Sequence, residues 1–357
     1  MTIFGTRPEA IKMIPVCNAL DQELGLTHTS LTTGQHDEML HDIISQFKYK
    51  PNNMLKLVRE RSSLSDLYSE LIEKLNKVIS NERPDIVLVH GDTASGFCGA
   101  LAAQLNRVTV GHVEAGLRTY DKSNPWPEET NRQLISRLAD LHFAPTKVNY
   151  DALIHEGIDE KSIFVTGNTV IDALKYIIDL HQIHRKHGDT FRVLVTCHRR
   201  ENQGANLQKL CNALLRLHDE FEKIEITLPV HMNPAVKNTI ENNLIGKSRI
   251  NLIPPQNYTD FIKIMFNSDL ILTDSGGIQE EAPSLGIPVL VLRNTTERPE
   301  AVDAGTVELI GMEEERIINS TLKYYRNFKS LSYKFNEQNP FGDGNSSKRI
   351  TKILKEY

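Results

Sequence analysis

Short apolar runs recur along the chain, each closed by a polar or glycine-containing turn and followed by a helix-like pattern. Residues 86–89 are apolar at consecutive positions, which is typical of a strand buried on both faces of a parallel sheet. A small-residue helix is expected next, at 94–105. In the second half, an apolar run at 270–273 leads through Ser-Gly-Gly into helical spacing at 278–285. Repeated units of this kind predict an α/β protein with two Rossmann-like parallel-sheet domains.

The same periodicities predict the other elements. We expect strands at 1–4, 26–33, 108–113, 141–144, 163–166, 192–196, 224–229, 250–253 and 289–292. We expect helices at 10–20, 37–47, 64–80, 128–139, 207–221, 258–266 and 346–357. The first apolar run is short, so we expect the chain to begin inside its first β-element.

The order of these elements divides the chain into two domains. We expect an N-terminal Rossmann-like domain at 1–168, a crossover at 169–190 that begins as a helix, and a C-terminal Rossmann-like domain at 191–340. Residues 341–357 should end in a helix that packs back on the N-terminal domain. A length of 357 residues is enough for two domains that each bury a core.

Charge and cysteine usage narrow the choice of partners and compartment. The formal net charge is −5 and the basic residues are scattered, so we expect no nucleic-acid partner and no anionic membrane partner. The sequence has no signal-peptide pattern and no run of about 18 apolar residues. Its four cysteines are far apart and form no CxxC pair, as in proteins of a reducing compartment. We therefore expect a cytoplasmic protein.

No cofactor or metal is expected. Gly246-Lys247-Ser248 resembles the end of a phosphate-binding P-loop, but Glu241 stands where the first glycine of that loop belongs. No GxGxxG fingerprint follows the first strand, and no DxD metal motif is present. These absences argue against a nicotinamide cofactor and against a divalent metal.

The glycine turn after residues 270–273 is a candidate nucleotide site. Gly276 and Gly277 let backbone N–H groups at a helix start approach an anion, because neither residue has a Cβ atom. Glu281 comes one turn later, where a carboxylate can accept hydrogen bonds from sugar hydroxyls. Arg298 follows the next strand and can bind phosphate oxygens in a forked geometry. An ordinary βαβ turn is the alternative for the glycines alone, but the carboxylate and the arginine favour a nucleotide.

Polar residues also end several other predicted strands, where α/β sheets bind ligands. Arg7 and Lys12 flank the first strand-to-helix turn, with a solvated surface charge as the alternative role of each. Asp92, Glu114 and His198 follow three further strands. A helix N-cap is the alternative role of Asp92, although the next threonine can cap as well. This distribution suits a nucleoside diphosphate bound by the C-terminal half, with its reacting group near the N-terminal carboxylates.

Long, ordered motifs in this sequence resemble those of a known enzyme family. They include FGTRPEAIKM, VHGDT, GHVEAGLRT, NPWPEETNR, GNTVIDAL, HRREN, PVHMNP and LTDSGGIQEEAPSLG. Together they extend over nearly the whole chain and resemble the non-hydrolysing bacterial UDP-N-acetylglucosamine (UDP-GlcNAc) 2-epimerases. The resemblance implies a GT-B fold, with the active site in the cleft between two Rossmann-like domains. It also implies reversible conversion to UDP-N-acetylmannosamine (UDP-ManNAc), which supplies sugars for cell-surface polysaccharide. We also expect a homodimer.

The resemblance assigns a catalytic group. Asp92, Glu114 and Glu128 match the acid/base carboxylates of the family, and His198 completes the set. The implied reaction eliminates UDP to give 2-acetamidoglucal and then adds UDP back, with the C2 proton returned to the opposite face. One group must remove a proton and another must deliver one. For Glu128 the alternative role is a favourable negative charge in the first turn of a helix.

Binding and regulatory residues follow from the same resemblance. Gln256 and Phe261 match positions near the uracil. The full substrate-binding set is Arg7, Lys12, Gln256, Phe261, Ser275, Gly276, Gly277, Glu281 and Arg298. Members from Gram-positive bacteria have a regulatory UDP-GlcNAc site, and the residues that correspond to it here are Gln35, His36, Arg61, Arg199 and His231. Ser62 stands where that site has a glutamine, so this chain departs from the regulatory pattern.

Two other functions fit a similar nucleotide-binding half. A GT-B glycosyltransferase, or a hydrolysing epimerase that releases ManNAc and UDP, would use the same UDP contacts with different chemistry. A catalytically silent sugar-nucleotide sensor is the third possibility, and the complete catalytic group argues against it.

Overall fold

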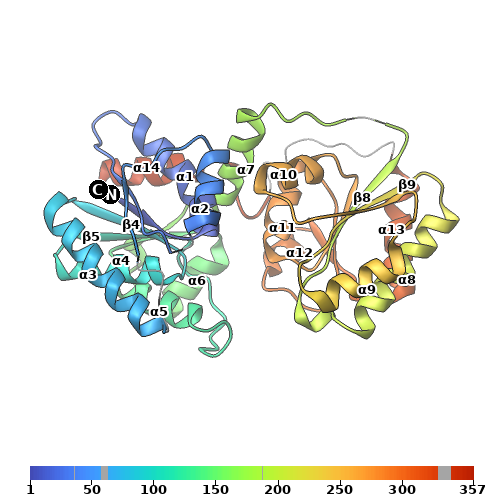
Figure 1. Ribbon diagram of the computed structural model, residues 1–357. Coiled ribbons are helices and arrows are strands. Elements are labelled where there is room, and N and C mark those ends of the chain that lie inside the picture. Colours follow the sequence, from blue (N-terminus) through green and yellow to red (C-terminus); the bar gives the residue numbers. More distant parts are fainter. Residues whose placement is uncertain (36, 58–62, 187, 329–338) are drawn as a thin grey trace. The chain divides into compact units, whose positions relative to one another are not determined.

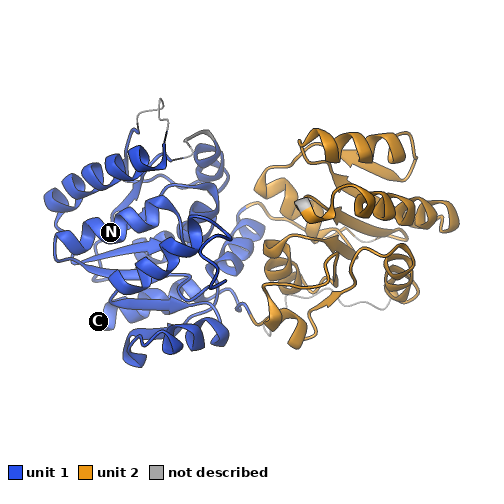
Figure 2. Ribbon diagram, turned by 90° about the horizontal axis from the view of Figure 1, so that it is seen from below, with its two compact units in different colours: residues 1–180, 341–357 blue, residues 181–340 orange. Residues whose placement is uncertain are grey.

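The computed structural model describes residues 1–35, 37–57, 63–186, 188–328 and 339–357. Its contacts divide the chain into two compact units (Figure 2): Met1–Leu180 with Phe341–Tyr357 is unit 1, and His181–Pro340 is unit 2. Each unit is built on one sheet in which every neighbouring pair of strands is parallel. The prediction of two parallel-sheet α/β domains is therefore confirmed.

The sheet of unit 1 has seven strands, in the order β3-β2-β1-β4-β5-β6-β7. The strands are β1 (Thr2–Phe4), β2 (Ser30–Thr32), β3 (Asn53–Met54), β4 (Ile86–His90), β5 (Thr109–Val113), β6 (Leu141–Ala144) and β7 (Ile163–Val165). The helices are α1 (Arg7–Gln22), α2 (Asp37–Gln46), α3 (Leu64–Glu82), α4 (Ala94–Leu105), α5 (Glu128–Leu138), α6 (Lys147–His155), α7 (Thr169–Leu180) and α14 (Ser346–Glu356), with a 3₁₀ helix at Glu160–Ser162. Helix α1 packs against α2, α7 and α14, and α4 packs against α3 and α5 (Figure 1).

The sheet of unit 2 has six strands, in the order β10-β9-β8-β11-β12-β13. The strands are β8 (Phe191–Thr196), β9 (Ile224–Pro229), β10 (Ile250–Ile253), β11 (Leu270–Thr273), β12 (Val289–Val291) and β13 (Val307–Leu309). The helices are α8 (Ala205–Glu220), α9 (Pro234–Leu244), α10 (Tyr258–Phe266), α11 (Gly276–Glu281), α12 (Pro299–Asp303) and α13 (Glu314–Tyr325), with 3₁₀ helices at Arg200–Asn202 and Ala282–Leu285. Helix α8 packs against α9 and α13.

The consecutive apolar residues of the central strands form the cores. In unit 1, Val87 and Val89 of β4 are fully buried and pack in one cluster with Ile3 of β1. In unit 2, Leu270 and Leu272 of β11 are fully buried in the cluster that also contains residues of β8 and α8. Burial on both faces of the sheet explains why these strands carry apolar residues without alternation.

The order of strands reverses at one point in each sheet. In unit 1 the chain runs outward from β1 to β3 and returns on the other side of β1 as β4. In unit 2 it runs from β8 to β10 and returns beside β8 as β11. Parallel α/β sheets bind ligands outside the carboxyl ends of strands at such a reversal. The turns after β1, β4, β8 and β11 are therefore where a site is expected in each unit.

Some expected elements differ in the structure. Residues 278–285 do not form one α-helix, because α11 ends at Glu281 and a 3₁₀ helix covers Ala282–Leu285. Pro283 has no N–H group to donate to the carbonyl of Gln279, so the α-helical hydrogen bonding stops there.

In the part of the chain that the structure describes, none of the helices combines the length and the apolar composition that a membrane span requires.

Candidate active site

Glu9 joins the two turns at the strand reversal of unit 1. Its Oε2 accepts the backbone N–H groups of Gly5 and Thr6 at 2.9 and 2.8 Å, and its Oε1 accepts the hydroxyl of Thr93 at 2.6 Å. The side chain is buried, and this burial raises the pKa of Glu9 against the opposing hydrogen bond from Thr93. Glu9 thereby fixes the turn after β1 relative to the turn after β4.

Glu114 follows β5 and is held by two groups from neighbouring elements. Its Oε2 forms an ion pair with the ammonium of Lys12 in α1 and lies 3.2 Å from Nε2 of His90, the last residue of β4. Burial opposes ionisation, but the charges of Lys12 and His90 outweigh it and hold the pKa of Glu114 well below its usual range. Oε1 has no hydrogen-bond partner among the described residues. Glu114 is thus an ionised carboxylate with one oxygen restrained and the other available.

The backbone of Glu114 is also unusual. Its φ of 62° lies in the left-handed region, which a residue with a Cβ atom adopts at some cost. Such strain tends to occur where a side chain must be aimed at a functional site. Here it accompanies the contacts of Glu114 with Lys12 and His90.

Asp92 lies in the turn after β4 and is paired with an arginine. Nε and Nη2 of Arg132 in α5 lie 2.8 and 2.6 Å from Oδ2 of Asp92, and Nη1 lies 3.3 Å from Oε2 of Glu129. Thr93, not Asp92, caps α4, because its hydroxyl accepts the N–H of Gly96. The capping alternative for Asp92 is therefore wrong, and its carboxylate is held by Arg132 instead.

The remaining predicted residues of unit 1 are less closely connected. Arg7 is the first residue of α1, is half-buried, and its guanidinium has no hydrogen-bond partner among the described residues. Glu128 lies in the first turn of α5, where a negative charge is favourable for the helix alone. Oε1 of Gln35 accepts the hydroxyl of Ser95 at 2.8 Å. His36 and Arg61, with Ser62, lie outside the described residues.

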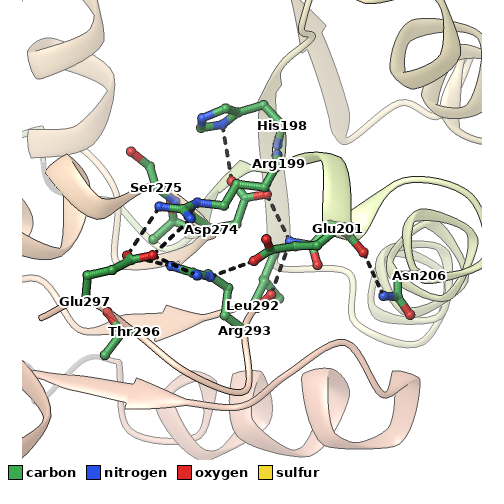
Figure 3. Close-up of polar contacts among 12 residues, drawn as sticks. His198, Arg199, Glu201, Asn206, Asp274, Ser275, Leu292, Arg293, Thr296 and Glu297 are labelled. Atoms are coloured by element: carbon green, nitrogen blue, oxygen red, sulfur yellow. Dashed lines mark hydrogen bonds and ion pairs between the residues drawn. The ribbon is translucent and has the colours of Figure 1, made fainter. Parts of the chain in front are cut away.

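In unit 2 the turn after β8 is tied to the end of β11 by Asp274 (Figure 3). Oδ2 of Asp274 accepts the backbone N–H groups of His198 and Arg199, both at 2.9 Å. The side-chain amide of Asn202 donates to the same oxygen at 3.0 Å. The ring of His198 stacks on that of His231 with a centroid distance of 6.0 Å and an interplanar angle of 15°. The structure thus brings His198 to the strand reversal of unit 2.

Arg199 belongs to a separate ion-pair network (Figure 3). Its Nε donates to the carbonyl of Asp274 at 3.0 Å, and its Nη1 lies 3.2 Å from Glu297. Arg293 contacts Glu297 at 2.8 Å and Glu201 at 2.9 Å. Burial opposes ionisation of Glu297, but its bonds to Arg293 and the charge of Arg199 lower its pKa to about 2. Arg199 is therefore held by partners within unit 2.

The Ser-Gly-Gly turn after β11 lies against Arg298. A Cβ atom on Gly276 would come within 3.1 Å of Cζ of Arg298, so the guanidinium packs directly on the glycine backbone. Nε of Arg298 also donates to Oε1 of Glu280 at 2.7 Å. Nothing lies within 4 Å of the corresponding position on Gly277, so this side of the turn is open. Ser275 is half-buried at the start of α11.

The other predicted nucleotide contacts lie on or beside α10. Oε1 of Glu281 accepts the hydroxyl of Tyr258 at 2.7 Å, and both residues are buried. Gln256 precedes the helix and donates to the carbonyl of Pro254 at 2.6 Å, while Phe261 lies half-buried within the helix. Tyr258 therefore orients the carboxylate that the sequence assigns to a sugar.

Sequence reasoning missed five residues that hold the predicted ones. They are Glu9, His90, Arg132, Tyr258 and Asp274. Four of them, Glu9, His90, Arg132 and Asp274, stand inside motifs that carry the family resemblance, so their positions are visible in the sequence. Their partners were not, because the partners come from other strands and helices and depend on sheet order.

Comparison with known proteins agrees with these findings. A family model for UDP-N-acetylglucosamine 2-epimerase matches residues 18–355. The UDP-N-acetylglucosamine 2-epimerase of Bacillus subtilis (strain 168) is 44% identical over 357 aligned residues, which are 99% of this chain and 94% of that protein. The crystal structure of UDP-GlcNAc 2-epimerase from Neisseria meningitidis bound to UDP-GlcNAc is 42% identical, with a TM-score of 0.85 over 100% of this chain and 99% of that one.

A more distant structure shares only the architecture. The crystal structure of a glycosyltransferase from Rickettsia africae is 13% identical, with a TM-score of 0.63 over 99% of this chain and 98% of that one. This likeness supports the GT-B-like fold and nothing beyond it. The family match confirms the resemblance seen in the sequence motifs and identifies an enzyme of the isomerase class. The chain belongs to the UDP-N-acetylglucosamine 2-epimerase family.

Proposed function

We propose that this enzyme interconverts UDP-GlcNAc and UDP-ManNAc by reversible inversion at C2, without hydrolysing either one. The observation that carries the proposal is the state of Glu114. A carboxylate whose pKa is lowered by Lys12 and His90, after burial has opposed ionisation, is ionised at neutral pH and can accept a proton, and one of its oxygens has no partner among the described residues. A proton acceptor of this kind is what loss of the C2 proton requires.

The residues of unit 2 are suited to the nucleotide. Arg298 lies on the Gly276 backbone, so its guanidinium and the N–H groups of the turn can bind the same diphosphate. Glu281, oriented by Tyr258, is suited to ribose hydroxyls, and Gln256 and Phe261 to the uracil. The bound UDP-GlcNAc in the Neisseria meningitidis relative supports a UDP-sugar as the ligand here.

The reaction needs no oxidant or reductant. A direct deprotonation at C2 is difficult, because no carbonyl group adjoins that carbon. When the C1–O bond breaks, its electron pair leaves with UDP and positive character develops at C1. The C2 proton then passes to a carboxylate, and the electrons of the C2–H bond form the C1=C2 double bond of 2-acetamidoglucal. Addition of UDP reverses these steps, and delivery of a proton to the other face inverts C2.

The roles in this scheme are those that the family resemblance implies, and the contacts of each residue support them. Glu114 accepts the C2 proton. Asp92 and Glu128 provide the other acid/base functions, including delivery of a proton to the opposite face of the sugar at C2. Arg132 restrains Asp92, so that its carboxylate has a fixed direction. His198, together with Arg298, stabilises the charge that develops on departing UDP.

The test is incubation of the purified protein with UDP-GlcNAc in D₂O, followed by NMR of the sugar. We expect UDP-ManNAc to appear with deuterium at C2, together with traces of UDP and 2-acetamidoglucal. Accumulation of free ManNAc would instead identify a hydrolysing enzyme. An unchanged spectrum would mean that the chain binds the sugar nucleotide without turning it over.

A further inference from the structure

Asp274 presents its two carboxylate oxygens to different partners. Oδ2 accepts hydrogen bonds from the backbone N–H groups of His198 and Arg199 (Figure 3), and it accepts a third from the amide of Asn202. These bonds fix both the position and the plane of a side chain that is completely buried. Burial opposes ionisation, but the hydrogen bonds from His198, Arg199 and Asn202 lower the pKa of Asp274 to about 2. The group is therefore a carboxylate throughout the physiological pH range.

The other oxygen faces the imidazole of His198. Oδ1 lies 3.2 Å from Nδ1 and accepts no hydrogen bond of standard geometry among the described residues. The buried thiol of Cys197 also interacts with this carboxylate. A carboxylate oxygen can only accept, so a proton on Nδ1 satisfies both atoms, whereas a bare Nδ1 would leave a buried anion facing a lone pair. The contact therefore favours the tautomer of His198 that carries its proton on Nδ1.

The opposite edge of the ring is left for a ligand. The side chain of His198 is 45% exposed, and its Nε2 has no hydrogen-bond partner among the described residues. Stacking on His231 restrains the plane of the ring, while Asp274 restrains its rotation within that plane. Nε2 is consequently aimed outward from the strand reversal of unit 2, with a defined protonation at the other nitrogen.

We propose that Asp274 is a positioning residue for the epimerase reaction: it holds His198 in the Nδ1–H tautomer, so that Nε2 faces the diphosphate of the substrate. When Nε2 also gains a proton, the adjacent carboxylate stabilises the imidazolium that donates to departing UDP. The kinetic part of this inference rests on the proposed function, but the tautomer does not depend on the reaction.

A purely structural role for Asp274 is the competing explanation, because the residue also joins β8 to β11. The chain offers a matched control at the other end of β11. Asp269 is also buried, accepts the backbone N–H of Arg192 at 2.8 Å, and lies 2.6 Å from Nη2 of Arg185. It joins the same two strands, and among the residues that the structure describes it contacts none that belongs to the candidate site.

The first measurement is the ¹⁵N NMR spectrum of the histidine rings in the full chain, with His198 assigned from the His198→Gln variant. In the neutral ring we expect the proton on Nδ1 in the wild type and in Asp269→Asn. In Asp274→Asn the amide N–H₂ can face the ring, so the proton should move to Nε2. A neutral wild-type ring with its proton on Nε2 would overturn the proposal, whether or not any variant folds.

The second measurement is steady-state epimerisation of UDP-GlcNAc. Asp274→Asn should lower kcat by about 10²-fold with a much smaller change in KM, since a misdirected general acid–base group typically costs 10²–10⁴-fold. Asp269→Asn should lower the melting temperature but leave kcat within about twofold. Asp269 only joins two strands, so its loss affects the stability of the fold and not the reaction. In the His198→Gln background, Asp274→Asn should cause little further loss. Equal losses in both backgrounds would show that Asp274 does not act through His198. An inactive wild type with the expected tautomer would contradict the proposed function and leave the positioning intact.

Discussion

The ammonium of Lys12 and the carboxylate of Glu114, which are 102 residues apart in the sequence, form an ion pair at the strand reversal of unit 1. The pair joins the second turn of α1 to the end of β5, and both side chains are largely buried, with 17% and 14% exposed. His90 contacts the same carboxylate oxygen. A charge held in this way both stabilises the fold and sets the protonation state needed for chemistry.

Replacing Lys12 by Met should therefore destabilise the protein in a pH-dependent manner. The lowered pKa of Glu114 means that the folded protein binds this proton more weakly than the unfolded chain. Its contribution to stability is present above the ordinary pKa of 4.5 and is lost as the pH falls through the lowered folded value. At pH 7 we expect Lys12→Met to reduce the free energy of unfolding by about 2 kcal/mol, and by less near pH 3.

Urea unfolding of both proteins at several pH values measures this difference. Lys77→Met is the matched control, because Lys77 pairs with Glu73 on the surface of α3, where both side chains are about two-thirds exposed, at 68% and 67%. Lys77 also lowers the pKa of Glu73, but solvent screens this exposed pair, so that variant should change the free energy of unfolding only slightly at any pH. A difference for Lys12→Met that is the same at pH 3 and pH 7 would contradict the role given to Glu114.

UDP alone should raise the melting temperature, because a ligand that binds only the folded state stabilises it by mass action. Arg298→Ala should weaken UDP binding by about 10- to 100-fold, as expected for loss of a charge-assisted hydrogen bond to phosphate. Asp92→Asn should leave UDP affinity nearly unchanged, since Asp92 is assigned to the sugar. Isothermal titration calorimetry measures the UDP affinity of both variants and of the wild type.

Arg316→Ala provides the control for removal of an arginine from unit 2. Arg316 lies in α13 and donates only to the carbonyl of Leu309 among the contacts of its side chain that the structure describes. Its removal should not alter UDP affinity. If Arg298→Ala and Arg316→Ala bind UDP equally well, the diphosphate does not contact Arg298.

Gly116, two residues after Glu114, should tolerate no side chain. Its φ is +86°, and a Cβ atom would lie 2.2 Å from the carbonyl oxygen of Asn149. Gly25 has a similar φ of +94° but nothing within 4 Å. Gly25→Ala should lower the free energy of unfolding by about 1–2 kcal/mol, the cost of placing a residue with a Cβ atom in a left-handed backbone conformation. Gly116→Ala adds a steric clash and should cost about 3–4 kcal/mol in urea unfolding. Equal costs would mean that the turn relaxes freely.

The strands that could be predicted are those whose signal is local. Residues 86–89 and 270–273 were predictable because strands buried on both faces need consecutive apolar residues, and both are central in their sheets. Strand β3 and strand β13 lie at sheet edges, are two and three residues long, and carry no such signal. Helix α13 was not predicted, although Ile317, Ile318 and Leu322 follow helical spacing and are buried in the core against which α8 also packs.

The residues of the candidate site likewise fall into those with a local sequence signal and those that only the fold reveals. Asp92, Glu114 and His198 could be proposed because each directly follows a recognisable strand. What holds them could not, since the pairing of Asp92 with Arg132 spans 40 residues and that of His198 with Asp274 spans 76. Such partners become neighbours only through the order of strands in a sheet. Sequence spacing therefore indicates which groups carry chemistry, whereas the fold determines their direction and charge.

The three carboxylates provide the most direct test of the reaction scheme. Asp92→Asn, Glu114→Gln and Glu128→Gln should each reduce kcat for epimerisation by about 10²–10⁴-fold, the usual contribution of a general acid–base group. For Glu114→Gln the loss has a specific cause, because the amide is not a base and leaves Lys12 without its counter-charge. Incorporation of deuterium at C2 from D₂O should fall in step with epimerisation in this variant, since both require removal of the C2 proton.

UDP affinity and the melting temperature must be measured for the same variants, because a misfolded protein would also be inactive. Glu73→Gln, which removes an exposed carboxylate of α3, should retain full activity. If Glu114→Gln still exchanges the C2 hydrogen at the wild-type rate, another residue is the base that removes it. Retention of the original hydrogen at C2 during turnover of the wild type would exclude elimination altogether, because that path releases the proton to a carboxylate before C2 is rebuilt.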